Sequence, residues 1–114
     1  MTNCIFCKIA SKEIPSKVIL ETEDVFAFHD INPQAPVHAV VIPKKHIKSL
    51  LDASDADESL LGKLLSASKE VAIQLGIAEE GFRVVTNIGE NGGQSVDHLH
   101  FHVLGGRPLT WPPG

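Results

Sequence analysis

The sequence predicts an α+β domain in which a five-stranded antiparallel sheet packs with one long and one short helix. Three observations predict this class. Short runs rich in valine, isoleucine and phenylalanine recur, one long amphipathic segment lies mid-chain, and strands and helices do not alternate regularly. A length of 114 residues fits a single domain spanning 1–114.

The N-terminal third predicts a short helix followed by two strands. Residues 4–14 form the predicted helix, which ends before Pro15 because a residue that precedes proline is pushed out of the helical region. Residues 17–21 and 25–29 are predicted strands joined by a polar turn. Two prolines and an asparagine make residues 31–36 a loop.

The middle of the chain predicts a third strand and the long helix. Residues 37–42 form the strand, which Pro43 stops, and a loop or short helical turn follows. Ser54 or Asp55 is suited to cap the start of the helix and Gly76 its end. Its apolar residues recur at three- and four-residue spacing; they are Leu60, Leu61, Leu64, Leu65, Val71, Ala72 and Leu75.

The C-terminal third predicts the last two strands. Residues 81–89 form the fourth strand, and residues 90–96 form a glycine-rich loop. Residues 97–106 form the fifth strand. The tail, residues 107–114, contains three prolines that exclude helix.

Composition limits the classes of function. A net charge of −4 and a pI of about 5.8 argue against a general nucleic-acid binder, which needs a basic face. The N-terminus has no apolar run of the length that a signal peptide or membrane anchor needs, so we expect a cytoplasmic protein that binds no membrane.

Three of the six histidines stand at alternate positions in the fifth strand, as His98, His100 and His102. Alternation on a strand places them on one face, with Leu99 and Phe101 facing the core. Three interpretations compete: a passive solvent-facing row, a metal site using two of the rings, and covalent catalysis by one imidazole. The outer pair is separated by roughly 13 Å of backbone, which disfavours one ion bound by all three.

The glycine-rich loop leads directly into these histidines. Its glycines allow backbone N–H groups to turn toward an anion, and Gln94 and Ser95 add side-chain donors. An ordinary hairpin turn is the alternative, since Asn-Gly favours turns. Next to the histidines, the loop is typical of a phosphate cradle.

The sequence resembles a known family at these motifs. HLHFHVLGG fits the histidine-triad pattern, and AFHDINPQAPVHAVVIPKKHI, NGGQSVDHLHFHVLGGR and the terminal WPPG extend the match. The chain resembles the Hint branch of the histidine-triad (HIT) nucleotide-binding proteins over nearly its whole length. The resemblance implies a HIT-like fold.

The resemblance also implies a reaction on purine nucleoside 5′-phosphoramidates of adenosine or guanosine. It makes His100 the nucleophile that attacks the α-phosphorus, with His102 and Ser95 at the phosphate and His38 in a proton network. Asp30 would accept from the ribose hydroxyls, and Asn87 would bond near the phosphate. The implied nucleotide-binding residues are Phe6, Ile9, Phe28, Asp30, Ile31, Val40, Asn87, Gly93, Gln94, Ser95, His100 and His102.

Simpler interpretations of several of these residues stay open. Phe28 and Val40 lie in predicted strands and fit plain core packing equally well. Asp30 precedes a proline-containing loop and fits a turn residue. His38 fits a hydrogen-bonded histidine in the core.

Cys4 and Cys7, spaced C-x-x-C, need two more ligands to close a tetrahedral zinc site. The candidates are His46 and His98, and the resemblance implies the same set in relatives with this opening motif. The zinc would be structural and would tie the N-terminal helix to the histidine strand. A redox dithiol and two unrelated buried thiols are the alternatives.

The resemblance further implies a homodimer in which the tail of each subunit, with Trp111, reaches the partner's site. A solvent-exposed tail is the alternative. For the function itself, two alternatives to the enzyme remain: a nucleotide-binding or partner-docking protein with little turnover, and a hydrolase in which two triad histidines hold a catalytic zinc.

Overall fold

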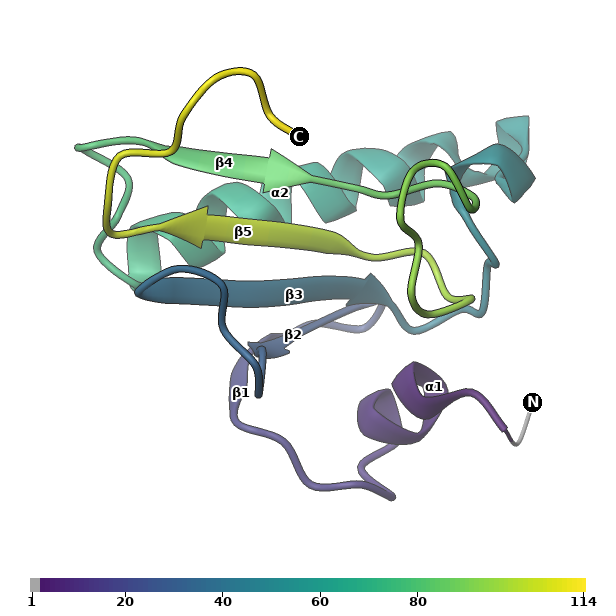
Figure 1. Cartoon of the computed structure of the whole chain (residues 1–114). Coiled ribbons are helices and arrows are strands. Elements are labelled where there is room, and N and C mark those ends of the chain that lie inside the picture. The colour runs from purple at the N-terminus through teal and green to yellow at the C-terminus, as the bar shows by residue number, and fades with distance from the viewer. Residues whose placement is uncertain (1–2) are drawn as a thin grey trace.

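The computed structural model describes residues 3–114, in which two helices and one antiparallel sheet form two layers plus a small third one (Figure 1). The strands are β1 (Val18–Glu21), β2 (Val25–His29), β3 (Val37–Pro43), β4 (Phe82–Val85) and β5 (Phe101–Gly105). The helices are α1 (Ile5–Ala10) and α2 (Glu58–Gln74), with 3-10 turns at Leu50–Asp52 and Asp55–Asp57. The predicted fold class is therefore confirmed.

The sheet has five strands in the order β1-β2-β3-β5-β4, and every neighbouring pair is antiparallel. The central strand β3 pairs with β2 and with β5, so it fixes the position of both. Val40 of β3 lies opposite Phe28 on one side and opposite His102 on the other. This register brings segments far apart in sequence next to each other at the middle of the sheet.

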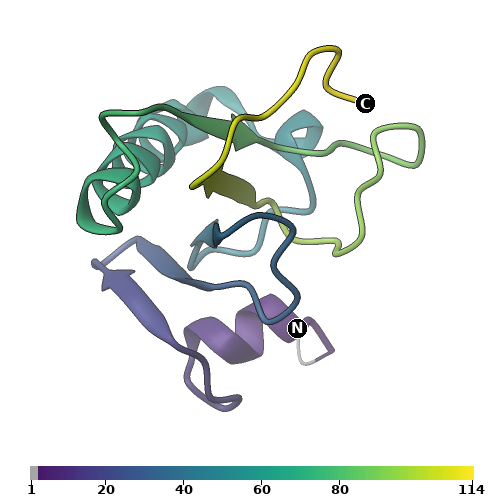
Figure 2. The ribbon, with the colours of Figure 1, turned by 60° about the vertical axis from the view of Figure 1, so that its left-hand side comes forward.

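The two faces of the sheet carry separate apolar clusters, and α2 and α1 lie on opposite faces (Figure 2). The larger cluster packs α2 against residues such as Val41, Leu99 and Val103. The smaller cluster packs α1 against Phe28 and Val40. The alternation predicted for β3 and β5 is confirmed, because Leu99 and Val103 face α2 and the histidines between them face away.

The long helix ends at the predicted glycine but begins later than predicted, at Glu58 with Asp57 as its N-cap. Ser54 caps the turn Asp55–Asp57 through a capping box with Asp57, and α2 follows directly. Gly76, with a φ of 79°, ends it. Leu65 departs from the predicted apolar stripe and is 55% exposed. No helix in the described part of the chain is long and apolar enough to cross a membrane.

Three elements are shorter than the sequence predicts. Helix α1 stops at Ala10, because Lys12 adopts a φ of 69°. Strand β5 begins only at Phe101, since Pro43 at the end of β3 has no N–H to extend the ladder. The Thr86 hydroxyl donates to the His100 carbonyl at 2.8 Å, and this bond replaces further strand pairing after β4.

Candidate active site and metal centre

The three triad histidines share the face of the sheet that α1 covers. Phe6 of α1 lies edge-on to two of them, with ring centroids 5.1 Å from His100 and 6.0 Å from His98. His98 and His100 are buried, and His102 is half-buried. A passive row of solvent-facing histidines is therefore wrong.

His100 is held in one orientation by the backbone. Its Nδ1 lies 2.7 Å from the carbonyl oxygen of His98. A carbonyl only accepts, so Nδ1 carries the hydrogen, and in the neutral ring the lone pair is on Nε2. The arrangement leaves the Nε2 lone pair of His100 available in a water-poor position.

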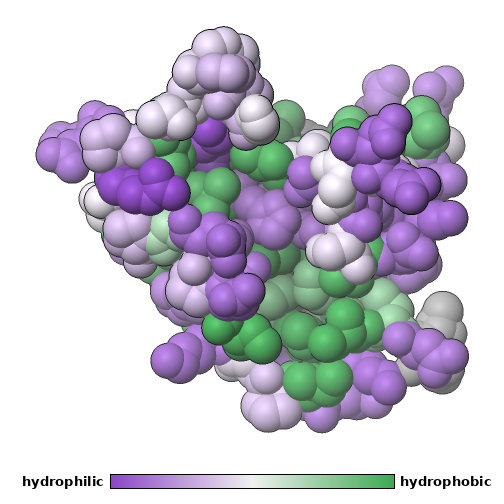
Figure 3. All heavy atoms as spheres, viewed as in Figure 1, coloured by the Kyte–Doolittle hydropathy of each residue, from purple (hydrophilic) through white to green (hydrophobic). Residues whose placement is uncertain are grey.

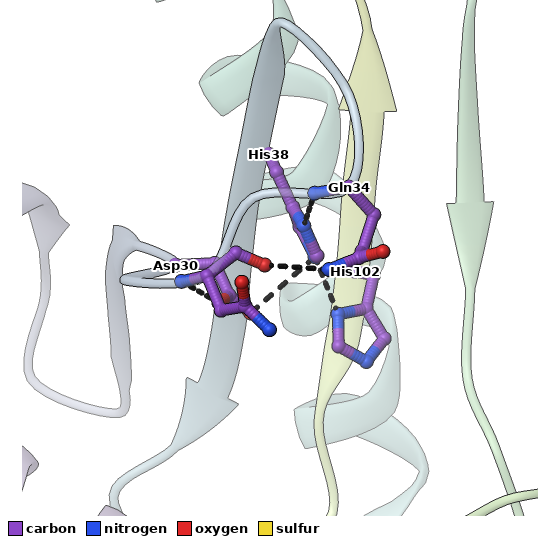
Figure 4. A network of polar contacts seen from close by, with 5 residues as sticks. Asp30, Gln34, His38 and His102 are labelled. Carbon is purple, nitrogen blue, oxygen red and sulfur yellow. Dashed lines mark hydrogen bonds and ion pairs between the residues drawn. The ribbon is translucent and has the colours of Figure 1, made fainter.

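His102 belongs to a second hydrogen-bonded group with His38 and Asp30 (Figure 4). His38 Nε2 lies 2.9 Å from His102 Nδ1 and 3.4 Å from Asp30 Oδ2. The backbone N–H of Gln34 donates to His38 Nδ1 at 3.0 Å. His38 is therefore both buried and hydrogen-bonded, and it joins the loop before β3 to the histidine strand.

This group is unsuited to a metal ion. Because Gln34 donates to Nδ1 of His38, the neutral ring carries its hydrogen on Nε2, the nitrogen that faces His102 and Asp30. A protonated nitrogen has no lone pair for a metal. The hydrogen bonds are satisfied among the three side chains instead.

Burial keeps these rings neutral. Burial lowers the pKa of His38, against a smaller raising effect of Asp30. Burial first, and then the neighbouring His100 and His38, lower the pKa of His102 from its ordinary 6.5 to about 4. Near neutral pH both rings are uncharged and act as hydrogen-bonding groups.

We expect the free energy of unfolding to decrease as the pH falls below about 6.5. Between the ordinary value of 6.5 and about 4, the unfolded chain binds a proton at His102 that the folded chain excludes. The contribution of His102 to the free energy of unfolding is fully present above pH 6.5 and is lost as the pH falls toward 4. Calorimetric melting across this range checks it, with His102→Gln expected to give a shallower profile. An unchanged slope in the variant contradicts it.

The two cysteines meet two histidines, as the sequence predicted. Ligand atoms of Cys4, Cys7, His46 and His98 all lie within 4.8 Å of one another. His98 Nδ1 is 3.3 Å from Cys4 Sγ, 3.6 Å from Cys7 Sγ and 3.2 Å from His46 Nδ1. Ligands around one tetrahedral zinc are separated by roughly 3.4–3.8 Å, given its bond lengths.

The tautomer of His98 fits this use. Its Nε2 lies 2.8 Å from the carbonyl oxygen of Pro43, so Nε2 carries the hydrogen and the lone pair of Nδ1 faces the sulfurs. The side chains present therefore suit a closed zinc site. Burial, and after it the neighbouring Cys4, raises the pKa of the Cys7 thiol, and a cation would reverse this effect.

A cavity of about 750 Å³ opens next to the Asp30–His38 group. Asp30 and Ile31, which were predicted to bind the nucleotide, line it together with His38, and Ile31 is 97% exposed. Its size lies within the range of small-molecule sites. Figure 3 shows the same face of the molecule, which is hollowed near its middle and apolar around α1.

The predicted apolar walls of the nucleotide site lie elsewhere. Phe28, Val40 and Ile9 are buried in the smaller cluster, and Phe6 packs on Phe28 with ring centroids 5.7 Å apart. These side chains do not line the cavity at Asp30. The plain-core interpretation of Phe28 and Val40 therefore describes this structure.

The glycine-rich loop is held together from within. Asn87 Nδ2 donates to the Gly92 carbonyl at 2.7 Å, and Gln94 Nε2 donates to the carbonyls of Lys48 and Val96 at 2.7 and 3.0 Å. The N–H groups of Gly93 and Gln94 also donate inside the loop. These N–H and amide donors of the predicted cradle are thus already hydrogen-bonded to backbone carbonyls, and the Asn and Gln side chains shape the loop.

Ser95 is exposed at the end of this loop and lines another cavity. This cavity has a volume of about 560 Å³ and is lined also by Asn3, Cys4, His46 and Asp97. It borders the cysteine–histidine group. The N-terminus and the glycine-rich loop therefore share one wall of the molecule.

Two groups at the site have no signal in the sequence. The Gln34 N–H and the Pro43 carbonyl act through the backbone, so their residue types reveal nothing. Thr86 is different: continuing the pairing of Val85 with His102 places Thr86 opposite Phe101, next to the His100 carbonyl that its hydroxyl contacts. Strand pairing would have brought Thr86 close to His100 without identifying the side-chain bond.

Known proteins share this fold and these motifs. Residues 11–109 match the HIT domain, and the chain belongs to the HIT family. A HIT family hydrolase from Legionella pneumophila Philadelphia 1 superimposes with a TM-score of 0.96 at 51% identity, covering 98% of this chain and 100% of that chain. The chain thus has the fold of HIT family hydrolases.

Two sequence relatives cover nearly the whole chain. The HIT-like protein slr1234 of Synechocystis sp. is 53% identical over 110 residues, which is 96% of each chain. The 14 kDa zinc-binding protein of Zea mays is 53% identical over 112 residues, covering 96% of this chain and 87% of the relative. The cysteine–histidine group of this chain is compatible with zinc.

Proposed function

We propose that the protein is a purine nucleoside phosphoramidase, which cleaves the P–N bond of adenosine or guanosine 5′-phosphoramidates through a covalent nucleotidyl-histidine at His100. The family and the likeness to the Legionella hydrolase support a hydrolase in general. The specific reaction depends on one observation: the hydrogen bond from His100 Nδ1 to the His98 carbonyl leaves Nε2 free.

The reaction would have two displacement steps at phosphorus. In the first, the Nε2 lone pair of His100 forms a P–N bond while the P–N bond to the amine breaks. The amine keeps the electron pair of that bond and takes a proton from water on the His102 side of the site, which leaves hydroxide. In the second step a water attacks phosphorus and gives one proton to that hydroxide. The P–N bond to His100 breaks, its electron pair returns to Nε2, and the nucleoside monophosphate departs.

Two parts of the site would hold the nucleotide. The Asp30 carboxylate, at the mouth of the cavity that Ile31 and His38 also line, suits the ribose hydroxyls as an acceptor. Asp30 also accepts from the Asn32 N–H at 2.8 Å, so it is a turn residue as well. Ser95 and His102 would donate to phosphate oxygens, while Asn87, Gly93 and Gln94 shape the loop beneath them. Phe6, Ile9, Phe28 and Val40 would support the base from beneath the surface.

We further propose a structural zinc held by Cys4, Cys7, His46 and His98. When bound, zinc would supply the charge that stabilises the thiolates and joins α1 to the segment before β5. His98 would then be fixed at both ring nitrogens, by the metal and by the Pro43 carbonyl. Since the His98 carbonyl receives the hydrogen bond of His100, the same residue would align the nucleophile.

The exposed side of α2 and the edge strand β4 fit a homodimer interface. Leu65 and Ile73 of α2 are 55% and 54% exposed, and β4 has an unpaired edge. Trp111 of the tail is 80% exposed in the single chain. We propose that a second copy covers these surfaces and that the tail approaches the partner's site.

Trapping the intermediate tests the proposed reaction. Turnover of adenosine 5′-phosphoramidate is quenched with alkali, because a phosphorus–imidazole bond is labile in acid, and peptides are then mapped by mass spectrometry. We expect one adenylyl group on the peptide that contains His100 and none when AMP replaces the substrate. Release of AMP with an adduct on another residue, or with no adduct at any quench time, contradicts the proposal. Binding without release instead indicates a nucleotide-binding protein.

A further inference from the structure

The peptide N–H of Gln34 points at the buried ring of His38. The distance from this nitrogen to His38 Nδ1 is 3.0 Å. An amide N–H only donates, so His38 Nδ1 must offer its lone pair and the neutral ring must carry its hydrogen on Nε2. A backbone group thereby selects one of two tautomers that are close in energy in water.

The selected hydrogen of His38 faces two acceptors. His102 Nδ1 is at 2.9 Å and Asp30 Oδ2 at 3.4 Å, and only the first lies well inside the usual range. His102 therefore accepts at Nδ1. The neutral His102 ring then carries its own hydrogen on Nε2, the nitrogen on the far side of the ring from His38 (Figure 4).

We propose that the Gln34 amide is a positioning group: through His38, it makes His102 present an Nε2–H donor, rather than a lone pair, toward the substrate phosphate. This inference deepens the proposed function and rests on it. A donor stabilises negative charge that develops on a phosphate oxygen, whereas a lone pair would repel it. One peptide group in the loop before β3 would thus determine whether a side chain on the neighbouring strand β5 donates or accepts.

The residues that flank this peptide group are hydrogen-bonded in the loop. The Gln34 carbonyl, which belongs to the next peptide unit, accepts from Arg107 Nη2 at 3.1 Å, and the Gln34 side chain donates to the Asn32 carbonyl at 2.9 Å. Asp30 in turn accepts from the Asn32 N–H. These bonds anchor the loop around the Pro33–Gln34 peptide, whose N–H faces His38. The lowered pKa of His38 and of His102 agrees, since the relay requires both rings to be neutral.

Nitrogen NMR of the zinc-loaded wild-type protein tests the tautomers directly. With 15N-labelled histidine, two-bond proton–nitrogen spectra near neutral pH are expected to show Nε2–H for His38 and His102. His100 is expected to show Nδ1–H and serves as an internal control for the opposite tautomer. A His102 ring with its hydrogen on Nδ1, or a rapid mixture of both forms, overturns the inference. This readout is independent of whether any phosphoramidate is hydrolysed.

A pair of variants then tests the cause. Gln34→Pro removes the N–H, and Gln34→Ala keeps it while losing the side-chain bond to Asn32. We expect Gln34→Pro to give a mixture of the two His102 tautomers. We also expect it to lower kcat roughly tenfold to hundredfold with KM nearly unchanged. Gln34→Ala should keep the wild-type tautomer and most of kcat. Equal kcat and equal spectra for both variants overturn the inference, and if Gln34→Pro does not fold, the wild-type spectrum decides.

The outcomes separate this inference from the proposed function. A protein that releases no AMP but shows the expected tautomers contradicts the enzyme and leaves the relay intact. A protein that forms the His100 adduct while His102 carries its hydrogen on Nδ1 supports the enzyme and overturns the relay.

Discussion

Replacing His100 by asparagine is expected to lower the rate of AMP release from adenosine 5′-phosphoramidate by at least about 10⁴-fold. The asparagine amide can still donate to the His98 carbonyl, which now accepts from His100 Nδ1 at 2.7 Å. The variant therefore keeps the backbone contact and loses the imidazole with the nitrogen that we propose as the nucleophile. Single-turnover chromatography measures the rate, and calorimetric titration with AMP is expected to give an affinity within a few-fold of wild type.

Thr86→Val is the matched control for this experiment. It removes the hydroxyl that donates to the His100 carbonyl at 2.8 Å, but it leaves the imidazole in place. We expect a loss of about tenfold or less, because only the support of the ring is weakened. If His100→Asn kept more than roughly one hundredth of the wild-type rate, a nucleophilic role for His100 would be untenable.

Removal of the Cys4 sulfur, a proposed zinc ligand, is expected to lower the free energy of unfolding by about 3 kcal/mol or more. Cys4→Ser isolates the metal contribution. The Cys4 sulfur also caps α1 by accepting from the Cys7 N–H at 3.4 Å, and serine is at least as good a cap. The loss therefore reports the ligand and not the helix end.

Urea unfolding and metal analysis check this expectation. Wild-type protein purified without chelator should carry one zinc per chain, and a strong chelator should shift its unfolding midpoint to lower urea. Cys4→Ser should carry no zinc and should not respond to the chelator. Below the unfolding transition, chelated wild type should still release AMP, because the zinc that we propose is structural and takes no part in the proposed reaction. If the chelator does not shift the urea midpoint of the wild-type protein, the proposal of a structural zinc is contradicted.

The fold could be predicted because its signals are local. Alternation in residues 37–42 and the apolar spacing of α2 identified both sheet faces, and Ser54 and Gly76 marked the ends of the helix. The lengths of β4 and β5 could not be predicted. They depend on which residues stand opposite, and Pro43 ends the pairing of a strand more than fifty positions away.

In the candidate site, too, the features with a local sequence signal could be predicted and the contacts that depend on backbone groups could not. Side-chain types and spacing identified the group of Cys4, Cys7, His46 and His98 before any coordinates, and the structure brings all four together. The sequence predicts that Gln94 and Asn87 donate to a phosphate. In the structure their amide groups donate to backbone carbonyls, and this contact could not be predicted from residue type. Main-chain groups such as the Gln34 N–H have no residue-type signature, so only a structure reveals them.

The cavity bordered by Asn3 has a practical consequence. Asn3 shares its lining with Ser95 and Asp97, so the backbone at residue 3 lies beside the glycine-rich loop. An affinity tag joined to this end of the chain would therefore be attached close to the proposed phosphate loop, and a tag that contained histidines would compete with the proposed zinc ligands. Assays of unknown amines should therefore use protein from which every such extension has been cut away.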